Sequence, residues 1–190
     1  MPLTKKRFRE NCLKKLRNSS KHNKLYKDSI VMNHLYKKLK FVKNKTILFY
    51  CPMPNEVDIR KLLKKLRKTN NILVPFMVGK SFKVVPYRLP LYASKFGIFE
   101  AKNSIKKNKK IDIAIVPVIG VDFNLQRIGF GKGMYDRFFA KLKKKPYTIF
   151  IQPELCFTKE KVCDDYDISC DVLLTPKVKT ITRKWKNNVK

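Results

Sequence analysis

The sequence predicts an α/β fold in which a mainly parallel sheet is covered by helices on both faces. Short, almost wholly apolar runs alternate along the chain with segments of helical periodicity, and this alternation is typical of strand–helix–strand units. The apolar runs carry few polar residues, as expected for strands that are buried on both faces. The chain of 190 residues shows neither an internal repeat nor a low-complexity linker, so we expect one domain.

Three stretches are predicted to be helical. The first runs from residue 3 to about residue 42, where apolar residues recur at three- and four-residue steps among Lys and Arg. The second, residues 58–67, returns to the same spacing. The third, residues 134–143, places four large apolar side chains on one side: Tyr135, Phe138, Phe139 and Leu142.

Six short apolar runs are predicted to be strands: residues 46–50, 72–74, 82–85, 111–118, 147–151 and 172–174. The stretch 89–110 is expected to be a loop with a basic end. Together these elements predict a single-domain three-layer α/β/α sandwich, Rossmann-like in its mainly parallel sheet. We expect this domain to span residues 1–190, with residues 179–190 as a basic, flexible C-terminal tail.

The charge of the chain is extreme and indicates an anionic partner. Lys and Arg number 45 against 14 Asp and Glu, which gives a formal net charge of +31. Hydrophobic residues make up 44% and aromatic residues 12%, which excludes a disordered basic arm. No uncharged apolar run of roughly 18 residues is present, which excludes a membrane-spanning segment. Nucleic acid, an anionic membrane and small polyanions all remain open as partners.

Cysteine and histidine narrow the chemistry that the chain can perform. None of the five cysteines forms a C-x-x-C pair, and no apolar stretch follows the basic N-terminus, so we expect free thiols in a reducing cytoplasm. The histidines are His22 and His34 alone, and the cysteine spacing is not typical of a zinc site. Catalysis must therefore rely on Lys, Arg, carboxylates and backbone N–H groups.

The most informative segment is a glycine-rich loop between the strand predicted at 111–118 and the helix predicted at 134–143. Glycines let a ligand approach the backbone closely, helix starts favour anions, and cations suit phosphate oxygens. The loop contains three of the 6 glycines and two cations: Gly129, Gly131, Gly133, Arg127 and Lys132. It matches neither a Walker A loop nor the dinucleotide fingerprint. A phosphate site of another kind is favoured over a plain connecting turn.

Carboxylates near this loop are candidates for binding Mg²⁺. Asp136 lies just inside the predicted helix, where a carboxylate often only compensates the helix dipole. Beside a bound phosphate it also suits Mg²⁺, which uses one or two carboxylates with phosphate oxygens and water. Six of the 14 acidic residues lie within residues 154–171. Ion pairing and metal binding both remain open for this acidic segment.

The residues around the glycine loop resemble the signature of a known enzyme family. The segment 127–138, RIGFGKGMYDRF, is similar to that of 5-formyltetrahydrofolate cyclo-ligase, also called 5,10-methenyltetrahydrofolate synthetase. Weaker similarities follow in the family's order along nearly the whole chain. They lie in residues 5–9, 49–58, 96–100, 146–148 and 167–175.

This resemblance implies an activity and a set of partners. The family converts 5-formyltetrahydrofolate and ATP to 5,10-methenyltetrahydrofolate, ADP and phosphate, with Mg²⁺, and folds as a three-layer α/β/α sandwich. The chain would thus be a ligase that forms a C–N bond, with two small-molecule substrates. The resemblance implies no specific nucleic-acid partner and no membrane. We expect a cytoplasmic monomer.

The resemblance also places functional residues on this sequence. Asp136 and Asp167 fall at metal positions, with Asp165 left open as the alternative to Asp167. Within this reaction we expect Lys132 and Arg127 to be catalytic, by offsetting charge on the γ-phosphoryl group. The positions implied for ATP are Lys5, Arg9, Arg127, Ile128, Gly129, Phe130, Gly131, Lys132, Gly133, Met134 and Tyr135. The positions implied for the folate are Cys51, Glu56, Phe96, Phe130, Gly131, Lys132, Gly133 and Met134.

The sequence departs from the family pattern at several positions. Met134 stands where a Tyr is usual, Ala101 follows Glu100 in place of Pro, and Phe96 stands where Trp is common. These departures concern the shape of the pterin pocket more than the phosphate chemistry, since Met can fill the space of an aromatic ring.

A basic nucleic-acid-binding domain without catalysis is the alternative interpretation. The net charge and the interspersed aromatic residues favour it. It leaves the glycine-rich loop unexplained, and no recognised nucleic-acid motif is present.

Overall fold

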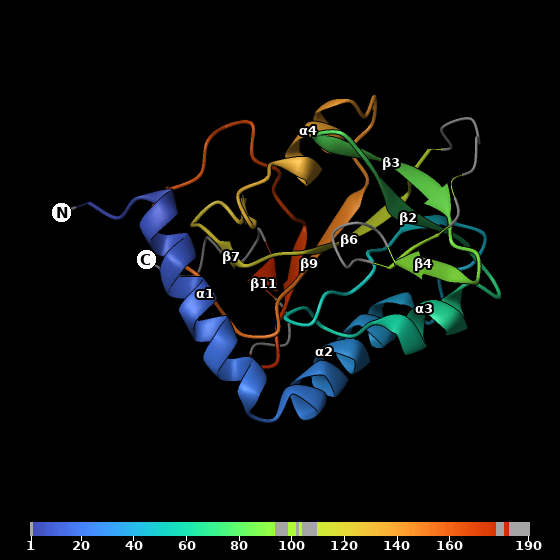
Figure 1. Ribbon diagram of the computed structural model, residues 1–190, viewed down its shortest axis with the longest axis horizontal. Coiled ribbons are helices and arrows are strands. Elements are labelled where there is room, and N and C mark those ends of the chain that lie inside the picture. Colours follow the sequence, from blue (N-terminus) through green and yellow to red (C-terminus); the bar gives the residue numbers. More distant parts are fainter. Residues whose placement is uncertain (1, 94–98, 102, 104–109, 178–180, 183–190) are drawn as a thin grey trace.

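The core of the fold is one twisted sheet of seven strands (Figure 1). The computed structural model describes residues 2–93, 99–101, 103, 110–177 and 181–182. The order of the strands across the sheet is β11-β10-β9-β6-β1-β2-β3. Their bounds are Thr46–Leu48 (β1), Asn71–Val78 (β2), Ser81–Pro86 (β3), Ile113–Pro117 (β6), Tyr147–Ile151 (β9), Val172–Leu174 (β10) and Ile181–Thr182 (β11).

The centre of the sheet is parallel and its two edges are antiparallel. Parallel ladders join β10 to β9, β9 to β6, β6 to β1 and β1 to β2, with Val116 opposite Phe150 in the middle. The edge strands β3 and β11 pair antiparallel with β2 and β10. The predicted α/β fold with a mainly parallel sheet is therefore confirmed.

Helices cover both faces of the sheet, as predicted. On one face, α2 (Lys24–Leu39) and α3 (Arg60–Leu66) pack their leucines against side chains such as Phe49 and Ile115, all fully buried. On the other face, α4 (Met134–Ala140) packs Phe138 and Phe139 against the sheet. Phe138 also stacks on Phe82 of β3, with ring centroids 4.4 Å apart. The burial of these apolar faces is the main favourable contribution to folding.

The N-terminal helix α1 (Lys5–Lys21) packs beside the sheet rather than over it (Figure 1). Its apolar side chains, Phe8, Cys12 and Leu16, form a separate cluster with Ile119, Ile128, Cys156 and Cys163. The stretch predicted as helical from residue 3 to 42 is thus two helices. They are separated at Asn23, whose φ of 55° lies in the left-handed region.

Several small elements differ from the sequence prediction. The stretch 89–110, expected as a loop, contains an antiparallel pair, β4 (Leu91–Ala93) and β5 (Phe99–Ala101). A second pair, β7 (Gly120–Val121) and β8 (Arg127–Ile128), precedes the glycine-rich loop and was not predicted. Ile181 belongs to the segment expected as a tail, but it is buried and pairs with Leu173 at the sheet edge. The rest of that segment, residues 179–180 and 183–190, lies outside the described residues.

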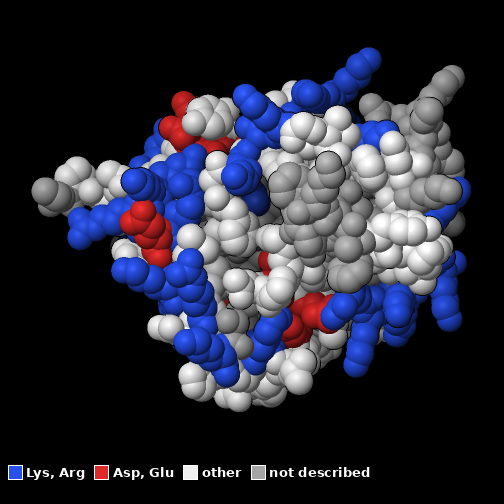
Figure 2. All heavy atoms as spheres, viewed as in Figure 1, with Lys and Arg blue, Asp and Glu red and all other residues white. Residues whose placement is uncertain are grey.

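Basic side chains dominate the face shown in Figure 2, where Lys and Arg gather along the edge formed by α1 and acidic groups are few. Helix α1 has no acidic residue in its first turn. Among the described residues, none of the helices has the length and apolar character that crossing a membrane requires.

Candidate active site

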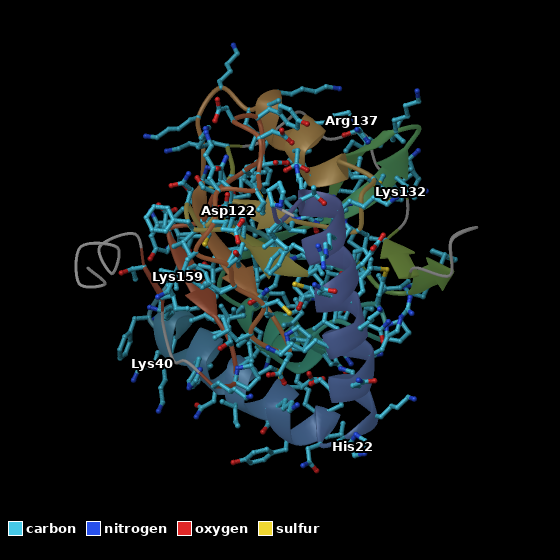
Figure 3. All side chains as sticks on the ribbon, turned by 90° about the vertical axis from the view of Figure 1, so that its left-hand side faces the viewer. His22, Lys40, Asp122, Lys132, Arg137 and Lys159 are labelled. Atoms are coloured by element: carbon cyan, nitrogen blue, oxygen red, sulfur yellow. The ribbon has the colours of Figure 1, made fainter. Side chains whose placement is uncertain are left out.

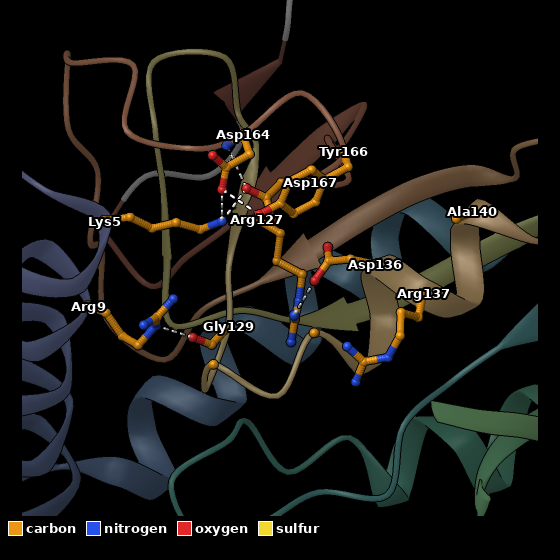
Figure 4. A pocket seen from close by; sticks show the side chains of 12 residues that line it. Lys5, Arg9, Arg127, Gly129, Asp136, Arg137, Ala140, Asp164, Tyr166 and Asp167 are labelled. Carbon is orange, nitrogen blue, oxygen red and sulfur yellow. Dashed lines mark hydrogen bonds and ion pairs between the residues drawn. The ribbon is translucent and has the colours of Figure 1, made fainter. Parts of the chain in front are cut away.

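A cleft of about 570 Å³ opens where α1, the glycine-rich loop and the acidic segment 164–167 meet (Figure 4). Its walls bring together residues that are far apart in the sequence. They are Lys5, Arg9, Arg127, Gly129, Gly131, Gly133, Asp136, Arg137, Ala140, Asp164, Tyr166 and Asp167. Eight of these twelve are positions that the sequence had assigned to ATP or to the metal.

The first turns of α1 contribute two cations to the cleft. Lys5 Nζ donates to Asp164 Oδ2 at 2.9 Å and also binds Asp167 Oδ2. Burial by itself would lower the pKa of Lys5, but the hydrogen bonds to Asp167 and Asp164 raise it above its ordinary value. Arg9 Nε donates to the carbonyl oxygen of Gly129 at 2.8 Å. Helix α1 is therefore tied both to the glycine-rich loop and to the acidic segment.

The glycine-rich loop packs closely around Arg127. A Cβ added at Gly129 would lie 2.6 Å from Arg127 Cζ, far inside van der Waals contact, so a larger residue there would displace the guanidinium. Gly133 is the N-cap of α4 with a φ of 58°, a left-handed conformation that glycine adopts readily. The loop is thus shaped by the guanidinium beneath it and by the turn into α4.

Arg127 is the central cation of the site, and it is almost fully buried, at 7% exposure. Its Nη1 lies 3.8 Å from Asp136 Oδ2, and its Nε donates to the Pro117 carbonyl at the end of β6 at 3.3 Å. Its Cζ lies 4.8 Å from the centroid of the Tyr135 ring. Burial lowers the pKa of Arg127, and Asp136, Tyr135 and Glu56 act against this shift. Negative charge thus reaches Arg127 from both Asp136 and Glu56.

Glu56 is the most perturbed carboxylate of the site. It is 7% exposed, and its Oε2 accepts a hydrogen bond from the backbone N–H of Met53 at 2.9 Å. Burial raises the pKa of Glu56 to about 7, although the Met53 N–H and the charges of Arg127 and Lys24 lower it. Burial of the Tyr135 hydroxyl raises its pKa. The neighbouring charge of Glu56 raises this pKa further, and half-buried Cys51 adds to the shift.

Asp136 and Asp167 line the same cleft and are the candidate ligands for Mg²⁺. Asp136 Oδ1 accepts from the Ile168 N–H at 3.3 Å, and Asp167 Oδ2 accepts from the Asp164 N–H at 2.7 Å. No group of three or more potential metal ligands occurs among the described residues. Two carboxylates beside a cationic cleft fit Mg²⁺ bound together with phosphate oxygens, rather than an all-protein metal site.

Between the two alternatives in the acidic segment, the structure places Asp167 in the cleft. The Asp165 side chain is 91% exposed and pairs with Lys161 at 3.0 Å on the surface. Asp167 is 7% exposed and lines the cleft wall.

Other predicted residues lie outside the cleft wall. Lys132 is exposed at the tip of the loop, toward the end of the molecule opposite His22 (Figure 3). The Ile128 side chain is buried in the cluster beneath α1, and Met134 packs against the core on the α4 side of the sheet. Phe130 is 41% exposed. Phe96 lies outside the described residues.

Four residues of the cleft had no predicted role, namely Arg137, Ala140, Asp164 and Tyr166. Tyr166 donates its O–H to Asp164 Oδ2 at 2.9 Å, and its ring centroid lies 5.5 Å from Lys5 Nζ. Arg137 Nε donates to the Lys80 carbonyl at 2.8 Å, and its Nη2 donates to the Lys132 carbonyl. A signal was present for Arg137, which stands inside the motif 127–138. Tyr166 carried none beyond its place among the acids.

Comparison with known proteins identifies the family of the chain. The model of the 5-formyltetrahydrofolate cyclo-ligase family matches residues 3–176. A probable 5-formyltetrahydrofolate cyclo-ligase of Schizosaccharomyces pombe is 27% identical over 153 residues, 70% of this chain and 75% of the relative. A 5-formyltetrahydrofolate cyclo-ligase of Mycoplasma pneumoniae is 28% identical over 131 residues, 68% of this chain and 72% of the relative.

Two solved structures share the fold. The 5,10-methenyltetrahydrofolate synthetase of Aquifex aeolicus superposes with a TM-score of 0.71 at 24% identity, covering 93% of this chain and 91% of its own. The synthetase of Mycoplasma pneumoniae gives a TM-score of 0.69 at 21% identity, covering 92% and 99%. The family model spans nearly the whole chain, and the fold agrees with it. The chain therefore belongs to the 5-formyltetrahydrofolate cyclo-ligase family, a class of enzymes.

Proposed function

We propose that the chain catalyses the ATP- and Mg²⁺-dependent cyclisation of 5-formyltetrahydrofolate to 5,10-methenyltetrahydrofolate, with release of ADP and phosphate. The observation that supports this most strongly is the position of Arg127. Its buried guanidinium lies beside Asp136, which lines the cationic cleft. The charge of Arg127 also lowers the pKa of Glu56. One cation thus lies between a candidate phosphate site and a candidate folate site.

ATP would bind in the cleft with its phosphates against the glycine-rich loop. Lys5 and Arg9 project from α1 toward this space, and the three glycines of the wall let phosphate oxygens approach the backbone (Figure 4). Exposed Lys132 at the loop tip would fold over the γ-phosphate when ATP is present. Backbone N–H groups from Ile128 to Tyr135 would complete the cradle.

The folate would bind on the side of Arg127 where Glu56 lies. Its pterin ring presents N–H donors, and a carboxylate accepts such donors through charge-assisted hydrogen bonds. Glu56 would serve as this acceptor, with half-buried Cys51 and exposed Phe130 beside the ring. Phe96 is retained as a folate contact on the resemblance alone. The loop residues from Phe130 to Met134 would contact both substrates.

The chemistry would proceed by phosphorylation of the formyl oxygen. That oxygen attacks the γ-phosphorus of ATP, and ADP leaves. The neighbouring folate nitrogen then attacks the activated formyl carbon and loses its proton, and phosphate departs with the former formyl oxygen. No protein nucleophile is required. Arg127 and Lys132 would offset the charge that develops on the transferred phosphoryl group, so catalysis rests on positioning and charge stabilisation.

Asp136 and Asp167 would hold Mg²⁺, which supplies charge neutralisation at the ATP phosphates when bound. Lys5 pairs with Asp167 in this structure. We propose that Lys5 turns from Asp167 toward the phosphates when ATP and the metal bind. The cation of Lys5 then lies beside the anionic phosphates, and the Asp167 carboxylate holds Mg²⁺ in place of the Lys5 ammonium.

The remaining properties follow from the same proposal. None of the five cysteines, all of which the structure describes, forms a disulfide, which fits a reducing compartment, and we propose the cytoplasm. A monomer with small-molecule substrates and no specific nucleic-acid partner is the accompanying expectation. The family match gives no support to the alternative of a nucleic-acid-binding domain, and it accounts for the glycine-rich loop that this alternative leaves unexplained.

The direct test is an absorbance assay for methenyltetrahydrofolate with 5-formyltetrahydrofolate as the substrate. We expect product only when both ATP and Mg²⁺ are present, with one ADP released for each product formed. A purified, folded chain that forms no product under these conditions would contradict the proposal. Salt-dependent binding of RNA would then be the next measurement.

A further inference from the structure

Lys24 and Asp28 form an ion pair on α2, one helical turn apart, beside the loop that carries Glu56. Lys24 Nζ donates to Asp28 Oδ2 at 2.6 Å and to the backbone carbonyl of Glu56 at 2.8 Å. The same Asp28 oxygen accepts the backbone N–H of Asp58 at 3.2 Å. One ion pair therefore binds the loop backbone on both sides of Val57.

The pair is too deeply placed to be an incidental surface contact. Asp28 is 4% exposed, and the Lys24 side chain is 27% exposed. A buried carboxylate is costly unless it is paired and hydrogen-bonded. Asp28 Oδ1 even lacks a hydrogen-bond partner within the described part of the chain. An apolar residue in place of Asp28 would avoid the cost of burying a carboxylate. What the charged pair provides instead is its hydrogen bonds to the loop.

The loop that carries Glu56 depends on contacts of this kind. Residues 49–59 form neither helix nor strand. Inside the loop, Glu56 and Met53 exchange two hydrogen bonds of 2.9 Å, one through the Glu56 carboxylate and one between backbone groups. Tyr50 donates its O–H to the Val57 carbonyl at 2.8 Å. The link from the loop to α2 runs through Lys24 and Asp28.

The same pair affects the charge of Glu56. Four groups from different elements act on or respond to this carboxylate: Lys24 of α2, Arg127 of β8, Tyr135 of α4 and Tyr50 after β1. Lys24 and Arg127 are the two cations that lower the pKa of Glu56, against the burial that raises it to about 7. Because this pKa lies near neutrality, removal of one cation changes the ionised fraction at physiological pH.

We propose that Lys24 and Asp28 are positioning residues of the folate site, which fix the Glu56 loop on α2 and keep a positive charge beside its carboxylate. Their role rests on the proposed function, in which Glu56 anchors the pterin ring. Neither residue touches the substrate. They act through the backbone of Glu56 and Asp58 and through the field at the Glu56 carboxylate.

The chain offers a matched control on the same helix. Lys27 pairs with Glu154 at 2.9 Å, and the exposures of the two side chains, 24% and 6%, resemble those of Lys24 and Asp28. Lys27 also donates to Ser19. Its contacts thus lie toward α1 rather than toward the Glu56 loop. Replacing Lys27 with Met removes an ion pair of similar burial without touching the folate side, and Glu154 keeps its pair with Lys177 at 3.4 Å.

The experiment compares Lys24→Met, Lys24→Arg and Lys27→Met with the wild-type chain in the cyclisation assay. We expect Lys24→Met to raise the KM for 5-formyltetrahydrofolate about tenfold, because displaced binding groups are costly, and to leave the KM for ATP unchanged. The acid limb of kcat/KM for the folate should move to higher pH, because loss of the cation raises the pKa of Glu56. Lys24→Arg should restore both properties, and Lys27→Met should alter neither.

The opposite results decide against the role of Lys24. The role of Lys24 would be overturned if Lys24→Met and Lys27→Met had the same KM for 5-formyltetrahydrofolate and the same acid limb of kcat/KM. If Lys24→Met does not fold, Lys24→Gln keeps one donor for the Glu56 carbonyl while removing the charge. A shifted acid limb in Lys24→Gln then supports the role, and an unshifted limb overturns it. A wild-type chain without cyclisation activity would instead contradict the proposed function itself.

Discussion

The guanidinium of Arg127 lies 3.8 Å from the carboxylate of Asp136, and both side chains are largely withdrawn from solvent. This pair joins the floor of the cleft to the first turn of α4. A buried cation of this kind is expensive to maintain unless it is paired with carboxylates, and here the charges of Asp136 and Glu56 both favour the protonated guanidinium. We interpret Arg127 as the shared electrostatic element of the two substrate sites.

Replacing Lys132 with Ala should lower kcat by roughly 10²-fold, the usual cost of removing one group that stabilises transition-state charge. The fold should be unaffected, because Lys132 is exposed. Lys144→Ala, another exposed lysine, is the control and should keep wild-type turnover. Steady-state kinetics with a melting curve for each variant provides the measurement. Near-wild-type turnover of Lys132→Ala would remove Lys132 from the catalytic group.

Replacing Asp136 with Ala should weaken Mg²⁺-dependent ATP binding about tenfold or more, as is usual when a metal site loses a supporting group. Calorimetric titration of ATP with and without Mg²⁺ measures this. Asp165→Ala serves as the control, because Asp165 lies on the surface in a pair with Lys161. Equal ATP affinities of the two variants would show that Asp136 is not a metal ligand.

Glu56 makes a pH-dependent contribution to stability with a defined sign. Its pKa is about 7 in the folded chain against an ordinary value of 4.5, so the folded state holds the proton more tightly than the unfolded state. The stability gained at low pH is present in full below pH 4.5 and is lost as the pH rises through 7.

Glu56→Gln tests this sign, because Gln keeps an acceptor for the Met53 N–H but has no charge to bury. We expect the variant to be more stable than the wild type at pH 8 by roughly 3 kcal/mol, from 1.36 kcal/mol for each pKa unit. At pH 4 the advantage should vanish. Urea denaturation at both pH values measures it. A pH-independent difference would contradict the raised pKa of Glu56.

Gly129→Ala should reduce both stability and activity. Its Cβ would lie 2.6 Å from Arg127 Cζ, so the guanidinium must shift away from Asp136 and the Pro117 carbonyl. Overpacking of this kind typically costs about 1–3 kcal/mol, and displacement of Arg127 should also lower kcat. Denaturation curves and steady-state kinetics check the two effects. A fully stable and active Gly129→Ala chain would contradict the close packing around Arg127.

Periodicity predicted the sheet because its central strands are buried on both faces and therefore almost wholly apolar, as in β6 and β9. It did not predict β7 and β8, which have two residues each. A run of two residues has no period. Their pairing depends on tertiary packing beneath α1, where Ile128 is fully buried.

The sequence identified many of the residues that line the cleft, but not the contacts between them. The glycine spacing and the family resemblance identified most of the cleft wall. The pair between Lys5 and Asp167 joins positions 162 residues apart, a separation that no local pattern can reveal. Arg127 was expected as a cationic arm for phosphate, whereas the structure buries it against the Pro117 carbonyl and the Tyr135 ring. The sequence does not reveal whether a single cation such as Arg127 is exposed, because its exposure depends on the tertiary packing around it.

The most direct test of the proposed function follows the formyl oxygen itself. With 5-formyltetrahydrofolate labelled with ¹⁸O in the formyl group, ATP and Mg²⁺, the released phosphate is analysed by mass spectrometry. Phosphorylation of the formyl oxygen predicts one ¹⁸O atom in each phosphate, together with methenyltetrahydrofolate. Product accompanied by unlabelled phosphate would contradict this chemistry.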